Sequence, residues 1–438
     1  MNWVTPEQRR KFGQSRRKQL GRQQNDQLDI KSRIASPVSL LERAERGRVP
    51  ALLKIKHQLM ALSPFSYFRG AAPVMAADLS ILPNSGIEAQ LCGDAHVRNL
   101  GAFAAPDGRL VFDINDFDET IRGPFEWDLK RMAASLVLAG RESHHKESAS
   151  RDAVRHCVLR YSEQMRQFAN MPLLEVGRFQ VHRLGDVQPV HQALFKAERA
   201  TPLHTLEQLT EPVHGKPDSR RFKEIKPNLT RITGSQAEKA LDALGPYREM
   251  LESQRQHLLS LYRPIDVAFK VVGTGSVGLR DYCIYFEGNG PEDPLFLQIK
   301  EEAHSCYAPY LPNNSHVWPN NGQRVVVGQR AMQLQSDPFL GWTHIGTRHF
   351  LVRQLNDHKG SIDLIDLAGS GLAAFGEVCG ELLARGHARS GDPLVISGYL
   401  GNGETFAEAL AGFGSLYADQ TEKDWQALRR SGKNLLPR

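Results

Sequence analysis

The sequence predicts an α+β fold in which a strand-rich segment lies between helical ones. Apolar residues recur at helical spacing over 129–137 and again over 372–383. Between these stretches, β-branched and aromatic residues cluster between Gly-rich turns at 267–272, 281–287 and 295–300. We therefore divide the 438 residues into a basic arm and helix at 1–50, a helical lobe at 51–262, a strand-rich lobe at 263–362 and, at 363–438, helices that pack back on the helical lobe.

Further elements follow from local patterns along the chain. Two helices, interrupted at Pro50 and Pro64, precede three short strands expected at 87–91, 93–100 and 110–114. The next helix is expected to bury its apolar face and to turn Lys130 and Arg131 outward. The chain then reads as mostly helical at 152–261, with a polar loop or insertion at 211–235, a later strand at 349–355 and a helix from 406 onward.

The composition excludes several classes of protein. Hydrophobic residues make up 41% of the chain and charged residues 24%, as in ordinary globular proteins. No stretch approaches the ~18 apolar residues of a membrane span, and the basic N-terminus lacks the apolar stretch of a secretory signal. The five cysteines lie far apart, which argues against a zinc knuckle or a disulfide framework. We expect a cytoplasmic protein with reduced thiols and no membrane partner.

Most of the net charge of +6 comes from a short stretch near the N-terminus. Seven Lys and Arg residues and no acid lie within 9–22, so the rest of the chain is nearly neutral. Such an arm could contact nucleic acid, acidic lipid or an acidic partner. We expect instead a solvated terminal helix, because charge runs usually face solvent, and we do not expect nucleic acid as a partner.

The densest group of polar residues spans two neighbouring segments, Leu91-Cys92-Gly93-Asp94-Ala95-His96-Val97-Arg98-Asn99 and the acidic hairpin at 112–119. Carboxylates packed this closely repel one another, so a cation or a basic partner is expected. Mg²⁺ fits, because it takes a few carboxylate or amide oxygens together with phosphate oxygens and water. Another reading is a surface hairpin with turn-forming Asp and Asn residues. The expected ligands are Asn99, Asp116 and Asp118, with Asp113 as a competitor of Asp116.

A glycine-rich segment supplies the second group of candidate residues. Residues 273–278 fit G-x-G-x-x-G, and the segment that follows is strand-like, whereas a dinucleotide-binding motif would lead into a helix. Glycines let backbone N–H groups approach phosphate oxygens, and a lysine on the next strand can neutralise them. A plain hairpin turn and an exposed lysine are the alternatives. The nucleotide-binding candidates are Gly273, Gly275, Ser276, Gly278 and Lys300.

The first group resembles the catalytic and metal-binding loops of protein kinases and aminoglycoside phosphotransferases: Gly-Asp, an Asn five residues after that Asp, and a hairpin into Asp-Phe. The resemblance implies that Asp94 orients or deprotonates an acceptor hydroxyl, while Asn99 and Asp116 hold Mg²⁺ on the phosphates of ATP. His96 is our second catalytic candidate. Cys92 stands where the small-molecule kinases usually have a His.

The order of the two groups is the reverse of that in kinases, where the glycine loop and lysine come first. The resemblance therefore implies a protein-kinase-like two-lobed fold that is circularly permuted. A kinase lysine pairs with a helical Glu, but the expected helix at 323–334 has none, so Glu301 or Glu302 would replace it. The helix at 372–384 would lead into the catalytic loop. Asp128 would suit the helix dipole or hold that loop through buried hydrogen bonds.

Five strings identify the chain as a member of the bacterial DUF2252 family: SPFSYFRG at 63–70, CGDAH at 92–96, NDFDET at 115–120, GPFEWDLKR at 123–131 and YADQT at 417–421. The family resembles kinase-like phosphotransferases. The expected function is ATP- and Mg²⁺-dependent phosphotransfer to an unknown hydroxyl or amine acceptor, either a small molecule or a protein. AMP transfer at the same site and a nucleotide-binding pseudokinase that regulates a partner are the alternatives.

Overall fold

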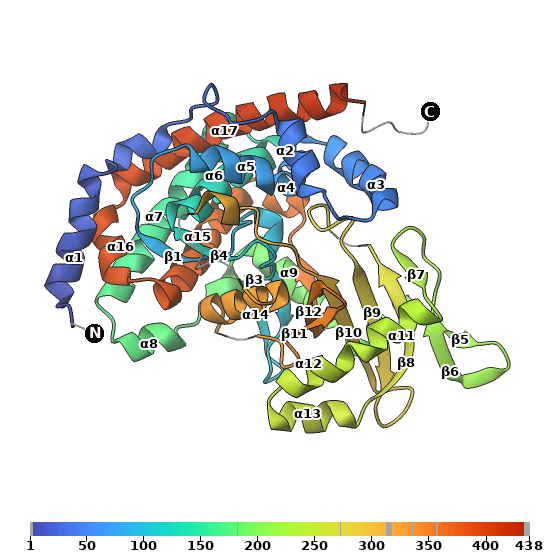
Figure 1. Cartoon of the computed structure of the whole chain (residues 1–438). Coiled ribbons are helices and arrows are strands. Elements are labelled where there is room, and N and C mark those ends of the chain that lie inside the picture. The colour runs from blue at the N-terminus through green and yellow to red at the C-terminus, as the bar shows by residue number, and fades with distance from the viewer. Residues whose placement is uncertain are drawn as a thin grey trace.

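The computed structural model describes residues 3–432 except 182, 272, 312–317, 335 and 356–357, and it leaves the side chains of 183–184 and 216–218 undescribed. It contains both helices and sheets, which confirms the α+β class. Figure 1 shows helices α6, α7, α15 and α17 packed together, with the largest sheet beside them. Val272, which we placed at the end of a strand, lies outside the described residues.

The helical part is built around one large apolar core, to which these four helices contribute nearly half of the residues. Helix α6 is buried along nearly its whole length because neighbours cover it on all sides. The helices are α1 Pro6–Ser15, α2 Pro37–Ala44, α3 Pro50–Ala61, α4 Pro64–Gly70, α5 Ala72–Ser80, α6 Glu126–Glu142, α7 Glu147–Ala169, α8 Leu173–Arg178, α9 Gln188–Arg199, α10 Pro202–Leu209, α11 Ser235–Asp242, α12 Leu244–Met250, α13 Ser253–Ser260, α14 Asn321–Met332, α15 Gly371–Ser390, α16 Pro393–Leu400 and α17 Glu404–Arg430.

The largest sheet has six antiparallel strands in the order β11-β12-β10-β9-β8-β7. Its central strands β9 and β10 are buried along their whole length, because α11–α13 cover one face and a second apolar cluster covers the other. The strands are β1 Glu88–Leu91, β2 Leu100–Ala104, β3 Leu110–Ile114, β4 Ile121–Pro124, β5 Thr210–Val213, β6 Lys216–Phe222, β7 Leu229–Arg231, β8 Arg263–Lys270, β9 Asp281–Glu287, β10 Pro294–Glu301, β11 Gly341–Ile345, β12 Arg348–Gln354 and β13 Gly360–Ser361.

Several segments differ from the sequence-based expectation. The polar stretch at 211–235 is not a plain loop, because it contains the hairpin β5–β6 and strand β7, which joins the large sheet. That sheet therefore begins at Leu229, and α11–α13 pack on it through residues such as Tyr247 and Leu251. Residues 97–99 form a 3₁₀ turn, and the strand expected at 93–100 begins only at Leu100.

The expectation that Lys130 and Arg131 face outward is wrong. Both side chains are buried, because α6 has no solvent-facing side over this stretch. The Lys130 ammonium lies 5.0 Å from the centre of the Phe413 ring of α17, which offers a cation–π contact. Arg131 forms an ion pair with Asp94.

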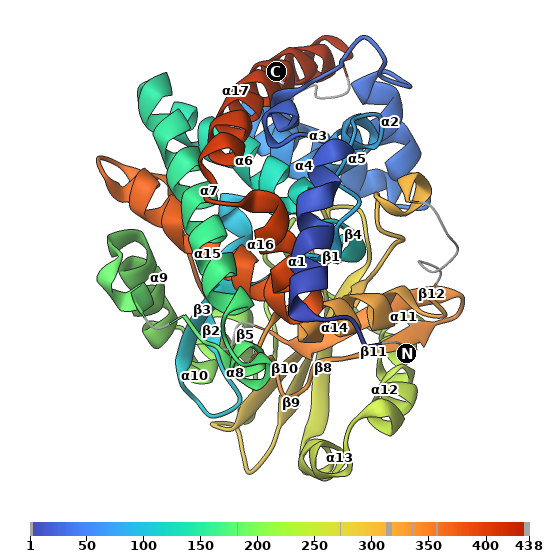
Figure 2. The same cartoon turned by 90° about the vertical axis from the view of Figure 1, so that its left-hand side faces the viewer.

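The helix of the basic arm is largely exposed to solvent, as expected, but it is not free of the rest of the fold. Helix α1 packs against α16 (Figure 2) through Gly13 and Gly398, where a Cβ atom would collide with the facing backbone. Arg17 donates hydrogen bonds to the carbonyls of Tyr399 and Gly398 (2.8 and 2.6 Å), and Arg22 donates to that of Leu400 (2.9 Å). These arginines satisfy carbonyls at the end of α16 that have no partner within the helix. Among the described residues, no helix is both long and apolar enough to cross a membrane.

Candidate functional site

Residues from both sequence motifs meet at one cavity between the helical part and the large sheet. Its lining includes the catalytic-loop, acidic-hairpin and glycine-loop candidates Asp94, His96, Asn99, Asp116, Asp118, Gly273, Gly275 and Ser276. Lys300 adjoins it, since its Nζ forms an ion pair with Asp118 and lies 3.9 Å from Asp116 Oδ1. Gly278 ends the glycine loop next to these residues. All ten candidates are thus brought together, while their chemical roles remain predictions.

The catalytic loop follows β1 and is held from behind by α6. Asp128 accepts hydrogen bonds from the backbone N–H groups of Cys92 (2.8 Å) and Gly93 (3.0 Å), the loop-holding contact considered for it above. His387 of α15 places its Nε2 3.3 Å from Asp128 Oδ2 and is fully buried, so it supports the loop without lining the cavity. Gly93 has φ +84°, and a Cβ there would lie 2.2 Å from the Glu119 carbonyl, so this position requires glycine.

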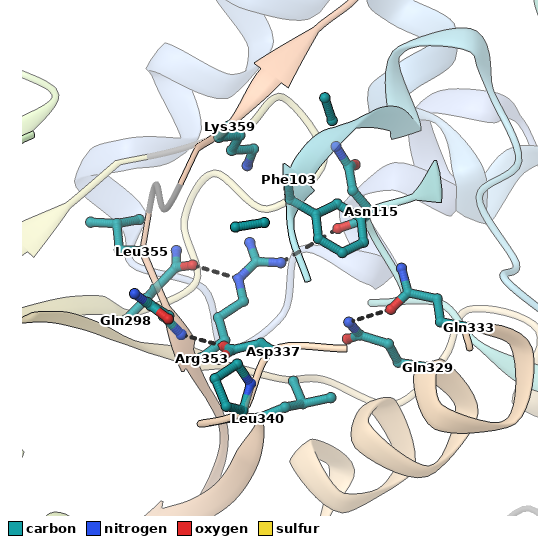
Figure 3. Close-up of a pocket in the computed structure, with 14 residues that line it drawn as sticks. Phe103, Asn115, Gln298, Gln329, Gln333, Asp337, Leu340, Arg353, Leu355 and Lys359 are labelled. Carbon is teal, nitrogen blue, oxygen red and sulfur yellow. Dashed lines mark hydrogen bonds between the residues drawn. The ribbon is translucent and has the colours of Figure 1, made fainter. Parts of the chain in front are cut away.

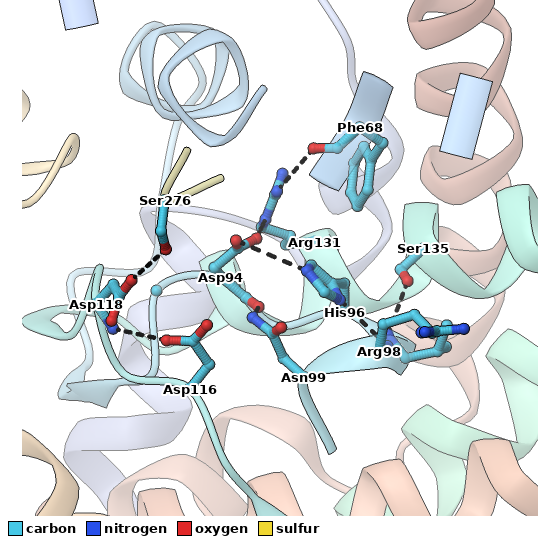
Figure 4. Close-up of polar contacts among 12 residues, drawn as sticks. Phe68, Asp94, His96, Arg98, Asn99, Asp116, Asp118, Arg131, Ser135 and Ser276 are labelled. Carbon is cyan, nitrogen blue, oxygen red and sulfur yellow. Dashed lines mark hydrogen bonds and ion pairs between the residues drawn. The ribbon is translucent and has the colours of Figure 1, made fainter. Parts of the chain in front are cut away.

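Asp94 is the carboxylate at the centre of the cavity wall (Figure 4). Arg131 donates to its Oδ1 at 2.5 Å and to the Phe68 carbonyl at 3.0 Å. Burial raises the pKa of Asp94 to about 6, although the charge of Arg131 opposes this shift. Asp94 therefore combines a fixed position with a proton affinity suited to general-base chemistry near neutral pH.

His96 and Asn99 are fixed by hydrogen bonds within the same loop. His96 Nδ1 accepts from the Arg98 N–H (3.2 Å), so in the neutral ring Nε2 carries the proton, and Nε2 lies 3.7 Å from Asp94 Oδ2. Burial keeps the pKa of His96 well below its ordinary value. Asn99 Nδ2 donates to the Asp94 carbonyl (2.9 Å), which leaves its Oδ1 available as an acceptor or a metal ligand.

The acidic hairpin separates Asp113 from Asp116. Asp113 points into a different cavity and pairs with Arg385 at 2.5 Å, whereas Asp116 lines the same cavity as Asp94. Asp118 Oδ2 accepts from Ser276 Oγ (2.9 Å) and from Lys300. Although burial opposes ionisation, the charge of Lys300 lowers the pKa of Asp118, while burial and the charge of Asp118 raise that of Asp116.

The partner of Lys300 is Asp118, and neither of the glutamates expected for this role forms an ion pair with it among the described residues. Glu301 pairs instead with Arg280 (3.0 Å) and Arg348 (2.6 Å). Glu302 is buried in the cavity wall, and its Oε1 has no hydrogen-bond partner among the described residues. The acidic turn thus supplies the carboxylate that pairs with the lysine of β10.

Helix α14 forms near the expected residues and presents an arginine to the site instead of an acid. Arg324 donates to the carbonyls of Thr120 (2.6 Å), Asp118 (2.7 Å) and Ala303 (2.9 Å). The helix therefore fixes the backbone of the acidic turn. These contacts join residues that lie far apart in the chain, and no sequence pattern indicated them.

The donor set fits a divalent cation such as Mg²⁺. The buried Oδ1 of Asp118 has no hydrogen-bond partner among the described residues, and Asp116 and the free Oδ1 of Asn99 line the same cavity. No group of three or more His, Cys, Asp and Glu side chains in the described part of the chain is arranged to hold a metal by itself. Mg²⁺ does not require such a group, because phosphate oxygens and water usually complete its shell.

The N-terminal segment adds basic residues, from helices α3 and α4 and the turn before α3, that the sequence did not assign to the site. Arg48, Lys56 and Arg69 line the cavity. Arg48 donates to the carbonyls of Gly275 and Val277, both at 2.7 Å, and the next residue donates its N–H to the Gly278 carbonyl. The glycine loop is thus tied to the helical part. Only Arg69 had a sequence signal, because it lies in the SPFSYFRG string.

A second cavity adjoins the acidic hairpin (Figure 3): Asn115 lines this cavity, whereas the next residue, Asp116, lines the first one. Arg353 occupies its centre and donates to Gln298 Oε1 at 2.8 Å and to the Asn115 carbonyl at 3.5 Å. Lys359 also faces this space. The rest of the lining mixes amide and apolar side chains, among them Gln329, Gln333, Phe103, Leu340 and Leu355.

Comparison with known proteins gives one match. No curated protein and no solved structure matched the chain. A family model described as an uncharacterized protein conserved in bacteria (DUF2252) matches residues 48–431, which include every site residue described above. The chain therefore belongs to the DUF2252 family.

Proposed function

We propose that this protein is an ATP- and Mg²⁺-dependent phosphotransferase with a circularly permuted, kinase-like two-lobed fold. The observation that carries the proposal is the meeting of the two half-motifs: Lys300 lies 3.9 Å from Asp116, and the glycine loop lines the same cavity as Asp94. In kinases these parts act together on the phosphates of ATP. The two half-motifs lie far apart in the chain, so closeness in sequence does not explain their meeting.

The connectivity supports the kinase-like arrangement. Strand β8, the glycine loop, β9 and β10 with Lys300 follow one another, and α14 comes next, as the glycine loop, the lysine on the third strand and a helix do in kinases. The end of α15 lies beside β1, because Ser390 Oγ accepts from the Gln90 N–H at 3.2 Å. In space, α15 therefore leads into the catalytic loop, although it follows that loop in sequence.

The two adjacent cavities suggest where ATP binds. Its phosphates would lie under the backbone N–H groups of the glycine loop, and its nucleoside would enter the cavity beneath Gln298. Lys300 would exchange its bond to Asp118 for the phosphate oxygens. Asn99, Asp116 and the freed Asp118 would hold Mg²⁺, which when bound neutralises phosphate charge.

Asp94 would act on the acceptor and not on the nucleotide. The acceptor oxygen or nitrogen attacks the γ-phosphorus, the bond from that phosphorus to the ADP oxygen breaks, and ADP leaves. Asp94 orients the acceptor and takes its proton, a role suited to its pKa of about 6. Arg131 keeps the carboxylate in place through its bond to Oδ1.

Incubation with Mg²⁺ and ATP labelled on either the α or the γ phosphate tests this function. Wild-type protein and Asp94→Asn would be compared with and without a mixture of hydroxyl and amine acceptors. Transfer or slow release of the γ label by the wild type alone supports phosphotransfer. Transfer of the α label would identify an AMP transferase, and nucleotide binding without movement of either label would identify a pseudokinase.

A further inference from the structure

Arg69 lies in the last turn of α4 and lines the cavity beside Asp94. Its backbone carbonyl would be 3.4 Å from a Cβ built on Gly275, so the tip of the glycine loop passes directly over this residue. Arg69 therefore lies next to the glycine loop and shares one cavity with Asp94 of the catalytic loop. The kinase template assigns no role to a residue from this N-terminal helix.

The guanidinium of Arg69 has no partner among the described residues, in contrast to the arginines around it. Arg131 pairs with Asp94, Arg48 donates to two carbonyls, and Arg98 lies 3.6 Å from Asp363 Oδ1. Arg69 forms no comparable bond to a described residue, and its Nε is buried without an acceptor. A buried cationic donor without an acceptor costs free energy, which a ligand oxyanion would recover.

We propose that Arg69 binds a phosphoryl oxyanion next to Asp94. The inference rests on the proposed function and deepens it, because it assigns a residue outside the kinase-like motifs to recognition of a phosphoryl group. A guanidinium matches two oxygens of such a group with two parallel N–H donors. The group could be the γ-phosphoryl of the nucleotide or a phosphate carried by the acceptor.

Calorimetric titration with inorganic phosphate tests the binding site without any nucleotide. Wild type, Arg69→Gln and the control Arg46→Gln would be compared, since Arg46 is exposed on the same N-terminal segment and its replacement removes the same charge. We expect the phosphate affinity to fall about 10- to 100-fold in Arg69→Gln and less than about 2-fold in the control. Equal losses in both variants, an unchanged affinity in Arg69→Gln, or no phosphate binding by the wild type would overturn the proposal.

Titrations with Mg²⁺-ATP and Mg²⁺-ADP distinguish the two sources of the phosphoryl group. If the nucleotide supplies the phosphoryl group, Arg69→Gln lowers the affinity for ATP by the same factor as the affinity for inorganic phosphate. The affinity for ADP then stays unchanged. If the acceptor supplies it, both nucleotides bind normally and phosphate still binds to the wild type in the presence of saturating ATP. Absence of nucleotide binding would refute the proposed function, while the phosphate titration would still decide the role of Arg69.

A second variant guards against loss of folding. Arg69→Lys keeps the charge but not the two parallel donors, so its phosphate affinity should lie between those of the wild type and Arg69→Gln. If Arg69→Gln does not fold, as judged by its thermal unfolding curve, Arg69→Lys replaces it in every titration. Full phosphate affinity in a folded Arg69→Lys protein would contradict paired recognition of two oxygens.

Discussion

The two walls of the cavity are held in different ways. The catalytic loop is fixed from behind by three α6 side chains at successive turns, since Asp128 accepts from Cys92 and Gly93, Arg131 donates to Asp94, and Ser135 accepts from the Val97 N–H at 3.0 Å. All three belong to one buried helix face. The glycine loop is instead held by single residues from two separate segments. Arg48 donates to the Gly275 carbonyl, and Asp118 accepts a hydrogen bond from Ser276.

This difference indicates which wall is preorganised and which adapts. Asp128, Arg131 and Ser135 do not line the cavity, so a ligand can enter without displacing these side chains. Under the proposed function, the bonds of Asp118 to Ser276 and Lys300 would lie across the path of the nucleotide and would open when its phosphates bind. We therefore expect changes in the catalytic-loop wall to affect chemistry and folding, and changes in the glycine-loop wall to affect ligand entry and local motion.

The largest effect is expected for Asp94→Asn. Turnover should fall about 10²–10⁴-fold, because the acceptor loses the group that takes its proton, whereas nucleotide affinity should stay nearly unchanged. Label transfer, calorimetry and urea unfolding on one preparation measure the three quantities. If Asp94 were only a turn former, the variant would lose stability with no selective loss of turnover. Full activity of the folded variant would show that Asp94 is not the group that takes the proton of the acceptor.

Asp128→Ala should have the next largest effect, on folding. Two buried N–H groups lose their acceptor, so we expect the free energy of unfolding to fall by about 3 kcal/mol. Asp107→Ala is the matched control, because Asp107 forms an exposed ion pair with Arg109 at 2.6 Å, and its loss should lower the free energy of unfolding far less than the loss of Asp128. Urea denaturation followed by circular dichroism gives both values. Similar losses in the two variants would argue against a rigid wall built by α6.

Asp116→Ala should remove most of the metal dependence of nucleotide binding. For the wild type, Mg²⁺-ADP at about 100 times its Kd should add roughly 2.7 kcal/mol of stability, and ADP without metal much less. The melting temperature with and without Mg²⁺ measures the difference. Asp113→Ala serves as the comparison, because that carboxylate is engaged by Arg385. Metal dependence that survives in Asp116→Ala and disappears in Asp113→Ala would reverse the ligand assignment.

Lys130→Met tests the electrostatic cost of the buried face of α6. Burial lowers the pKa of Lys130 to about 8, although the charges of Glu126 and Asp26 oppose the shift. The folded state thus releases this proton more readily than the unfolded chain, so protonation of Lys130 destabilises the fold at pH 7, and this penalty fades as pH rises from about 8 towards 10.5. We expect the variant to be about 1–2 kcal/mol more stable than wild type at pH 7. The difference in stability between the variant and the wild type should shrink by pH 10, as measured by urea unfolding of both proteins at each pH. A difference that does not depend on pH would contradict the electrostatic cost assigned to Lys130.

The sequence predicted local features better than contacts between distant segments. Strands β3 and β9 have the predicted bounds, because β-branched and aromatic residues define strands over a few positions. The two motifs could be found because their chemistry is concentrated in short stretches. The contact of Arg48 with Gly275 could not be predicted from the sequence, because an arginine that donates to a distant carbonyl leaves no periodic pattern. Burial of Arg131 likewise depends on which helices surround α6.

Arg48→Gln should have the smallest effect and bears most directly on the comparison of the two walls. The substitution removes the bonds to the Gly275 and Val277 carbonyls, each worth about 1 kcal/mol. Hydrogen exchange of amides in 273–279 should therefore accelerate about 5- to 30-fold, while exchange in 92–99 stays at the wild-type rate. Arg46→Gln, two residues away and exposed, should change neither segment. Equal acceleration in both loops would mean that Arg48 supports the whole fold, and the distinction between a rigid and an adaptable wall would then fail. Acceleration confined to the glycine loop would instead show that this wall can open while the groups around Asp94 stay in place.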